Sequence, residues 1–141
     1  MGISLQEATA MVDNALAKGR ELNLNPLTVV VLDAGGHLVA LKREDNSGIL
    51  RPQIAIGKAW GCLGMGVAST RVMETRYTAR PSFLASLIEL ADGNMVPVAG
   101  GVLVKRDGEV VGAVGVTGDT SDNDEICALA GVQSVGLEAS A

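Results

Sequence analysis

The glycine-rich segment Gly100–Asp119 constrains the fold of this chain more than any other stretch. Its centre, Asp107-Gly108, is a pair whose backbone readily adopts the positive φ angles of a tight hairpin turn. Gly112 and Gly115 lie inside the strand that should follow, and glycine weakens a strand unless the space of its missing side chain is needed. We therefore predict an antiparallel hairpin whose glycines make room for a bulge, a neighbouring backbone or a ligand on the sheet.

Composition narrows the class of protein. With 141 residues, 48% of them apolar, the chain can bury a core, and we expect a single domain over residues 1–141. The net charge is −5, the basic residues are scattered and only 2% of residues are aromatic, so no nucleic-acid surface is expected. No apolar run approaches the roughly 20 residues of a membrane span, and the first residues lack a secretion signal. We predict a soluble, cytoplasmic protein without a membrane or nucleic-acid partner.

Short turns join the strands of each predicted pair, which is typical of antiparallel hairpins. Strands are predicted over residues 28–32, 37–43, 96–98, 101–105 and 109–117. Helices are predicted over residues 5–19, 52–63, 70–78, 82–91 and 122–130. Ser4 and Glu7 have the spacing of a capping box, and Ser121 is the expected cap of the last helix. This order predicts the α+β class, with helices packed on a mostly antiparallel sheet.

His37 is the only histidine, and it follows the turn Asp33-Ala-Gly35-Gly36. One histidine excludes a two-histidine metal site within a single chain. Two interpretations remain for it: a surface residue beside a turn, or a ligand to haem iron or at a subunit interface. A structural pair between Asp33 and Arg43 is a further alternative for this hairpin. Cys62 and Cys127 have no neighbouring ligand in the sequence and are expected to be buried thiols, not zinc ligands.

The predicted helix over residues 52–63 combines glycines with one lysine. Gly57, Gly61 and Gly64 recur at helical spacing, which indicates either close packing or a helix thinned to admit a flat ligand or a partner subunit. Lys58 either extends its amine to water or points into a pocket. In a pocket it would pair with a carboxylate of Asp33 or of a bound ligand.

Residues 117–125 pass from a strand through a glycine loop into a helix. Such a junction often presents free amides to an anion, but Asp119 and Asp124 oppose a phosphate and the P-loop pattern is absent. Two interpretations remain. The segment is either a helix cap with acidic residues near the positive helix end, or the polar wall of a pocket made by Thr117 and the amides that follow it.

Three stretches together resemble the GlcG/HbpS family, also called the haem-degrading domain. Residues 33–45 (DAGGHLVALKRED) resemble its first signature and residues 54–59 (IAIGKA) its second. Residues 100–104, 112–118 and 122–125 resemble the third, with Thr117 where many members carry serine. The resemblance implies a profilin-like α+β fold, with an antiparallel sheet of about five strands flanked by helices. It also implies self-assembly, from dimers to octamers, and haem binding in part of the family.

The resemblance and the residues together predict a small-molecule binding protein, with haem or another tetrapyrrole as the leading ligand. The candidate ligand-binding residues are Asp33, Gly35, Gly36, His37, Lys58, Thr117, Gly118, Asp119 and Asp124, with His37 as the axial ligand of haem. We expect the three segments that carry them to contribute to one shared site. One alternative is an accessory enzyme for a small hydroxy or carboxylic acid, using Lys58, Thr117, Asp33 and Asp124. Another is a ligand-free oligomeric accessory protein whose glycine faces pack subunits.

Overall fold

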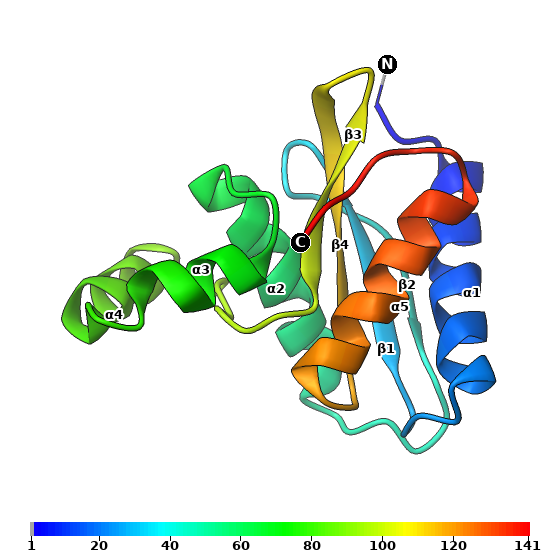
Figure 1. The fold of residues 1–141 in the computed structure, drawn as a ribbon, viewed down its shortest axis with the longest axis horizontal. Coiled ribbons are helices and arrows are strands. Elements are labelled where there is room, and N and C mark those ends of the chain that lie inside the picture. Colours follow the sequence, from blue (N-terminus) through cyan, green and yellow to red (C-terminus); the bar gives the residue numbers. More distant parts are fainter. Residues whose placement is uncertain (1) are drawn as a thin grey trace.

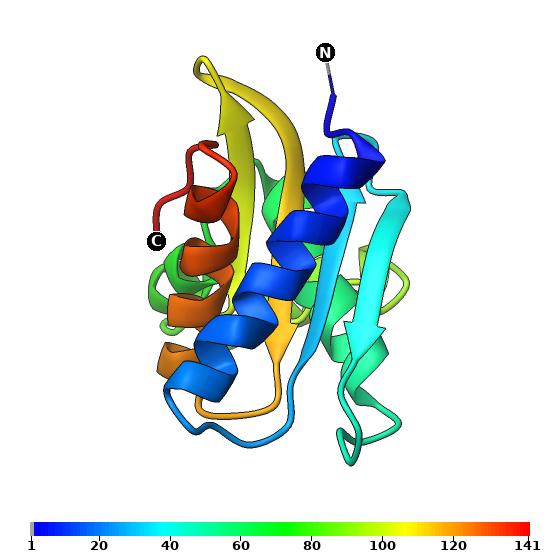
Figure 2. The ribbon, with the colours of Figure 1, turned by 90° about the vertical axis from the view of Figure 1, so that its right-hand side faces the viewer.

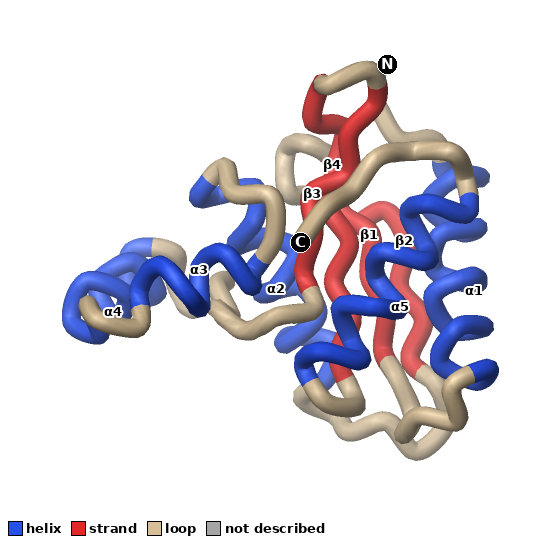
Figure 3. The backbone as a smooth tube through the Cα atoms, viewed as in Figure 1, coloured by secondary structure: helices blue, strands red, loops and turns tan. Residues whose placement is uncertain are grey.

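The computed structural model describes residues 2–141, in which one sheet lies between two layers of helices (Figures 1 and 3). The elements are α1 (Leu5–Glu21), β1 (Thr28–Asp33), β2 (Leu38–Arg43), α2 (Arg51–Met65), α3 (Thr70–Tyr77), α4 (Pro81–Leu90), β3 (Gly101–Arg106), β4 (Glu109–Thr117) and α5 (Ser121–Ser134). Helices α1 and α5 lie side by side on one face of the sheet, and α2 covers the other (Figure 2). The core therefore lies on both faces of the two central strands.

The sheet has four strands in the order β2-β1-β4-β3, and every neighbouring pair is antiparallel. The α+β class is confirmed, whereas the predicted strand over residues 96–98, and with it the count of about five, is wrong. The amide of Val96 donates to the carbonyl of Gly57 in α2 (3.1 Å), and Pro97 has no amide to offer a ladder. Ser69 and Glu138 form isolated bridges to β3 at its outer edge instead.

The predicted capping box fixes the start of α1. The Ser4 hydroxyl accepts from the amide of Glu7, and the Glu7 carboxylate accepts from the amide of Ser4, both at 3.0 Å. Glu7 also accepts two hydrogen bonds of 2.9 Å from Arg106 of β3. The hydrogen bond from the Ser4 amide and, next, those from Arg106 lower the pKa of Glu7.

The cap of α5 is Thr120, not the predicted Ser121. The Thr120 hydroxyl is the group that accepts a hydrogen bond from a helix amide, that of Asn123.

Glu7→Gln is expected to lower the free energy of unfolding at about pH 7 by up to about 1 kcal/mol, because glutamine can still accept from the Ser4 amide but cannot form the ion pair with Arg106. Because folding lowers the pKa of Glu7, its contribution is complete above the ordinary value of 4.5 and disappears as the pH falls through the lowered value. Urea unfolding of both proteins at about pH 7 and about pH 3 measures the effect. The difference in unfolding free energy between wild type and variant should be smaller at about pH 3 than at about pH 7. An equal difference at the two pH values would contradict a stabilising role for the charged Glu7 carboxylate.

The contact between α2 and the sheet explains the glycines of the hairpin. A Cβ at Gly115 would overlap the carbonyl oxygen of Ala55 in α2, and a Cβ at Gly101 would overlap the carbonyl oxygen of Lys58. A Cβ at Gly112 would overlap the backbone of β1. Neighbouring backbone therefore fills the space at these glycines, which is one of the three alternatives that the sequence left open.

Helices α3 and α4 extend sideways from the layered body (Figure 1). No residue of α4 is buried, although most of its ten residues are apolar. Partly buried residues of α4 pack on a small cluster around Met73, Tyr77 and Met95. None of the described helices combines the length and the apolar character that a membrane crossing requires.

Candidate functional site

The predicted site residues lie at the two ends of the sheet. β1 pairs with β4 so that Thr28 lies opposite Thr117 and Asp33 lies opposite Gly112. The turn that carries His37 is therefore at one end, and the loop from Thr117 into α5 is at the other (Figure 1). The three segments expected to form one shared site do not converge.

At the second of these ends, Lys58 points into the protein and pairs with Asp124. Its amine lies 3.1 Å from Oδ2 of Asp124 and donates to the carbonyl oxygen of Val116 at 3.0 Å. The two side chains are only 3% and 1% exposed. A Cβ at Gly100 would lie 2.8 Å from the amine, so this glycine leaves room for the lysine. The other carboxylate oxygen of Asp124 accepts from the amide of Asp119 at 3.0 Å, and the pair thereby ties α2 to the start of α5.

Burial affects the two members of this pair in opposite directions. It lowers the pKa of Lys58, while the carboxylate of Asp124 acts against that change. It raises the pKa of Asp124, while the charge of Lys58 acts against that change. Because each charge is compensated mainly by the other and both are shielded from water, the geometry is that of an internal ion pair between two layers.

Arg51 is a neighbour of Thr117 that the sequence did not reveal. Its Nη1 donates to the Thr117 hydroxyl at 2.8 Å. Thr117 is 1% exposed, and on the adjacent strand the hydroxyl of Thr28 lies 2.8 Å from that of Ser47. Arg51, the first residue of α2, therefore already forms a hydrogen bond with the Thr117 hydroxyl, which was expected to line a pocket. No local pattern marks Arg51, because its partner is 66 residues away.

The loop of Gly118 and Asp119 is held by contacts within the protein. Gly118 has a φ of 142°, and a Cβ there would overlap the carbonyl oxygen of Pro26. Asp119 accepts from the side chain of Asn123 at 2.8 Å and from the amide of Asn25 at 3.0 Å, and these bonds lower the pKa of Asp119. The observed contacts are those of a helix cap and a chain connection.

At the opposite end, the turn after β1 presents His37 to solvent. Oδ1 of Asp33 accepts from the amides of Gly35 (2.9 Å) and His37 (3.0 Å), and the imidazole Nδ1 lies 3.2 Å from the same oxygen. The amide of His37 is the main cause that lowers the pKa of Asp33, so the carboxylate stays charged beside an imidazole that is 80% exposed. Arg43 lies opposite Thr28 at the far end of β1, so the alternative Asp33–Arg43 pair is not formed.

Trp60 of α2 lies beside this turn, and the sequence did not single it out. Gly36 has a φ of 83°, and a Cβ there would lie 3.0 Å from Nε1 of Trp60. A Cβ at Gly64 would lie 2.8 Å from the other edge of the indole. A shallow pocket of about 180 Å³ is lined by Trp60, Gly64, Met65, Leu87, Leu90, Ala91 and Met95. Gly57 and Gly61 face side chains of the same chain, so close packing accounts for these two.

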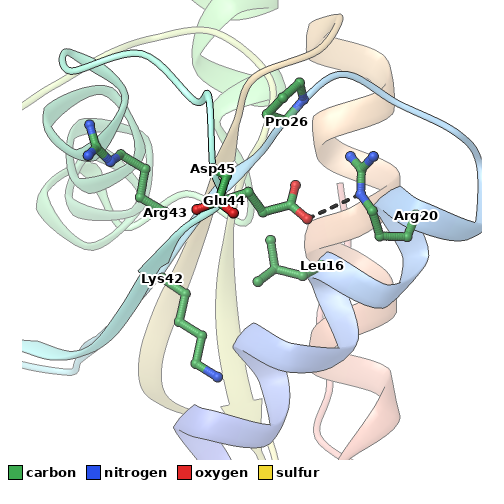
Figure 4. A pocket seen from close by; sticks show the side chains of 7 residues that line it. All are labelled: Leu16, Arg20, Pro26, Lys42, Arg43, Glu44 and Asp45. Atoms are coloured by element: carbon green, nitrogen blue, oxygen red, sulfur yellow. Dashed lines mark ion pairs between the residues drawn. The ribbon is translucent and has the colours of Figure 1, made fainter.

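A separate pocket of about 390 Å³ lies between α1 and the end of β2 (Figure 4). Arg20 and Glu44 face each other across it, with 3.1 Å between Nε and Oε2. Glu44 also accepts from the amide of Leu27 at 2.7 Å, and Lys42 pairs with Asp13 at 2.7 Å. Arg20, Lys42 and Glu44 are therefore paired within the protein, whereas among the described residues no ion pair is found for Arg43 and Asp45, which also line the pocket.

The cysteines are buried and free, as predicted. Burial raises the pKa of Cys62 to about 12 and that of Cys127 to about 11, so both are protonated thiols at neutral pH. Among residues 2–141, no group of three or more His, Cys, Asp or Glu side chains is arranged to hold a metal ion.

A sequence model of the family described as "Haem degrading protein HbpS-like" matches residues 3–133. The chain belongs to the HbpS-like family. The protein GlcG of Escherichia coli K12 is 30% identical to it over 116 residues, which are 82% of this chain and 81% of GlcG. These matches confirm the resemblance that the three signatures indicated.

Solved structures agree with this membership. A crystal structure of a PduOC–haem complex superposes with a TM-score of 0.88 over the full length of both chains, at 22% identity. The crystal structure of HbpS superposes with a TM-score of 0.84 at 25% identity, covering 96% of this chain and 92% of that one. The α+β arrangement of this HbpS-like chain is therefore shared with both.

Proposed function

We propose that this HbpS-like chain binds a small molecule, with haem or another tetrapyrrole as the leading ligand and His37 as the axial ligand. The observation that carries the proposal is the pairing of an exposed imidazole with a fixed carboxylate: Nδ1 of His37 lies 3.2 Å from Asp33. A carboxylate at Nδ1 fixes the tautomer and orientation of a metal-binding histidine and leaves Nε2 for the metal. The family description and the haem bound to PduOC support the choice of ligand.

The residues present fit an axial ligand. His37 is 80% exposed, and among the described residues no hydrogen bond is found for its Nε2. The turn is rigid because Asp33 accepts from two of its amides. When bound, haem would supply an iron centre capable of electron transfer and of reactions with oxygen species. The protein itself would hold the imidazole of His37 in place and keep Nδ1 directed at the carboxylate of Asp33.

A hemin titration followed at the Soret band tests this proposal. The wild-type protein is expected to shift the band from its free-hemin position, and His37→Ala is expected to abolish the shift. Asp33→Asn should keep the ligand but weaken affinity by about tenfold, the scale of a lost orienting partner. Asp45→Ala, in the loop after β2 and at the other end of the sheet from the turn, is the control. A free-hemin spectrum at saturation, or an unchanged spectrum in His37→Ala, would contradict the proposal.

We also propose that the protein assembles with copies of itself, as the family resemblance implies, in a range from dimer to octamer. Exposed apolar side chains support this: Ile49 is 87% and Leu50 is 62% exposed at the loop before α2. Their replacement by aspartate in Ile49→Asp/Leu50→Asp is expected to reduce the mass measured by light scattering at least about twofold, because buried charge disfavours an apolar interface. A wild-type mass of one chain, or an unchanged mass in the variant, would contradict an interface at this loop.

The enzyme alternative has less structural support. Its polar set requires Asp33 near Lys58 and Asp124, but Asp33 lies at the other end of the sheet. Lys58 and Asp124 are bonded to each other and almost fully shielded from solvent. A substrate carboxylate would have to displace an internal ion pair to reach the amine, so we favour a structural role for these two residues.

A further inference from the structure

We propose that Trp60 and the apolar pocket beside it hold one edge of the tetrapyrrole, independently of any metal at its centre. This inference rests on the proposed function, since it extends the His37 site. It adds a second, chemically different contact, which decides affinity for the ring and leaves iron ligation to the histidine.

The contacts of the indole place it between the turn and the pocket. Its pyrrole edge lies against Gly36, directly before His37, where a Cβ would be 3.0 Å from Nε1. Its benzene edge lies against Gly64, where a Cβ would be 2.8 Å away. Both glycines therefore leave space that the indole occupies, and Gly36 also needs its positive φ of 83°. The indole thus lies between the backbone of the turn that carries His37 and the pocket beside α4.

The chemistry of the pocket suits the apolar edge of a porphyrin. The lining beyond the indole is aliphatic or thioether, from Met65, Leu87, Leu90, Ala91 and Met95, and it includes no charged side chain. An aromatic ring beside methionine is a surface on which flat, polarizable rings pack well. The volume of about 180 Å³ is below the roughly 300–1,000 Å³ of pockets that enclose a ligand. The pocket therefore accepts only one edge, and the rest of the ring extends toward His37.

The two contacts predict different dependence on the metal. Iron must be present for His37 to act as a ligand, whereas packing on Trp60 requires only the ring. Metal-free protoporphyrin IX should therefore bind through the pocket alone, more weakly than hemin. Its own fluorescence reports the binding without any reaction at iron.

Fluorescence titration with metal-free protoporphyrin IX, paired with hemin titration, tests the inference. Trp60→Leu is expected to weaken both ligands by about tenfold, the upper range for a lost aromatic contact. His37→Ala should weaken hemin alone. Leu90→Ala, at a side chain that is 83% exposed, should weaken both by about threefold with little effect on folding. Thermal unfolding and light scattering establish that each variant remains folded and keeps its mass.

The outcomes separate this inference from the proposal it extends. If wild type binds hemin through His37 but both pocket variants bind protoporphyrin IX as wild type does, the pocket contact is refuted and the axial ligand stands. If hemin binding needs Trp60 but not His37, the axial ligand is refuted and the pocket stands. If the wild-type protein binds neither compound, both are refuted.

Discussion

Gly115→Ala is expected to destabilise the protein by about 3 kcal/mol or more, the upper range for overpacking a tight core, or to prevent folding. Gly115 lies on central strand β4, opposite Val30 of β1 and Gly101 of β3. A Cβ there would overlap the carbonyl oxygen of Ala55, which is backbone of α2 and has no rotamer by which to move away. The overlap could be removed only if α2 moved away from the sheet. Urea unfolding followed by far-UV circular dichroism measures the loss.

Gly48→Ala is the matched control for this change. A Cβ at Gly48 would meet only the side chain of Arg51, at an ordinary 3.8 Å, and its backbone does not require a positive φ. Alanine there should be neutral or stabilise slightly, because it restricts the unfolded chain. An unfolding midpoint of Gly115→Ala equal to that of wild type would show that α2 does not pack on β4 as described.

Lys58→Met is expected to destabilise the protein by about 3–5 kcal/mol, because it leaves the carboxylate of Asp124 buried without its partner. The carboxylate is 1% exposed and would keep only the amide of Asp119 as a hydrogen-bond donor. Replacing both residues, in Lys58→Met/Asp124→Leu, should restore much of the loss, because no uncompensated charge then remains. A double-mutant cycle on the free energies of unfolding measures the coupling.

The loss in Lys58→Met should also depend on pH. Burial already raises the pKa of Asp124, and removal of the lysine charge removes the main effect that acts against this. A group whose pKa is raised by folding favours the folded state as the pH falls toward that value, so the variant should recover stability on acidification. Lys42→Met is the control, because Lys42 and Asp13 form an exposed pair worth less than about 1 kcal/mol. Equal losses in Lys58→Met and Lys42→Met would contradict the buried pair.

Local sequence signals predicted most of the secondary structure. The Asp107-Gly108 turn and the Ser4–Glu7 capping box were correctly placed because all their partners lie within a few residues. The strand predicted over residues 96–98 is wrong because the amide of Val96 donates to α2 and the amide of Val98 donates to the carbonyl of Val96, so neither pairs with the sheet. Its neighbours in sequence carry no sign of that contact, which depends on how α2 packs.

The candidate site was predictable only where it is local. Asp33 and His37 are four residues apart, and the turn between them follows from Gly35 and Gly36, so their proximity could be anticipated. Trp60 could not be connected to the turn, because no sequence spacing relates the middle of α2 to Gly36.

At the other end of the sheet, too, contacts between residues far apart in the sequence could not be predicted. Lys58 is unusual in an apolar helix, but its partner Asp124 is 66 residues away, and no sequence spacing relates the two. The glycines of the hairpin likewise stand out in the sequence. That they accommodate backbone and not a ligand follows only from the position of α2.

A crystal structure of the protein grown with hemin tests the central claim most directly. We expect iron bonded to Nε2 of His37, with Nδ1 still beside Asp33 and one edge of the macrocycle on Trp60. Hemin bound to another residue, or bound with His37 free in solvent, would contradict it.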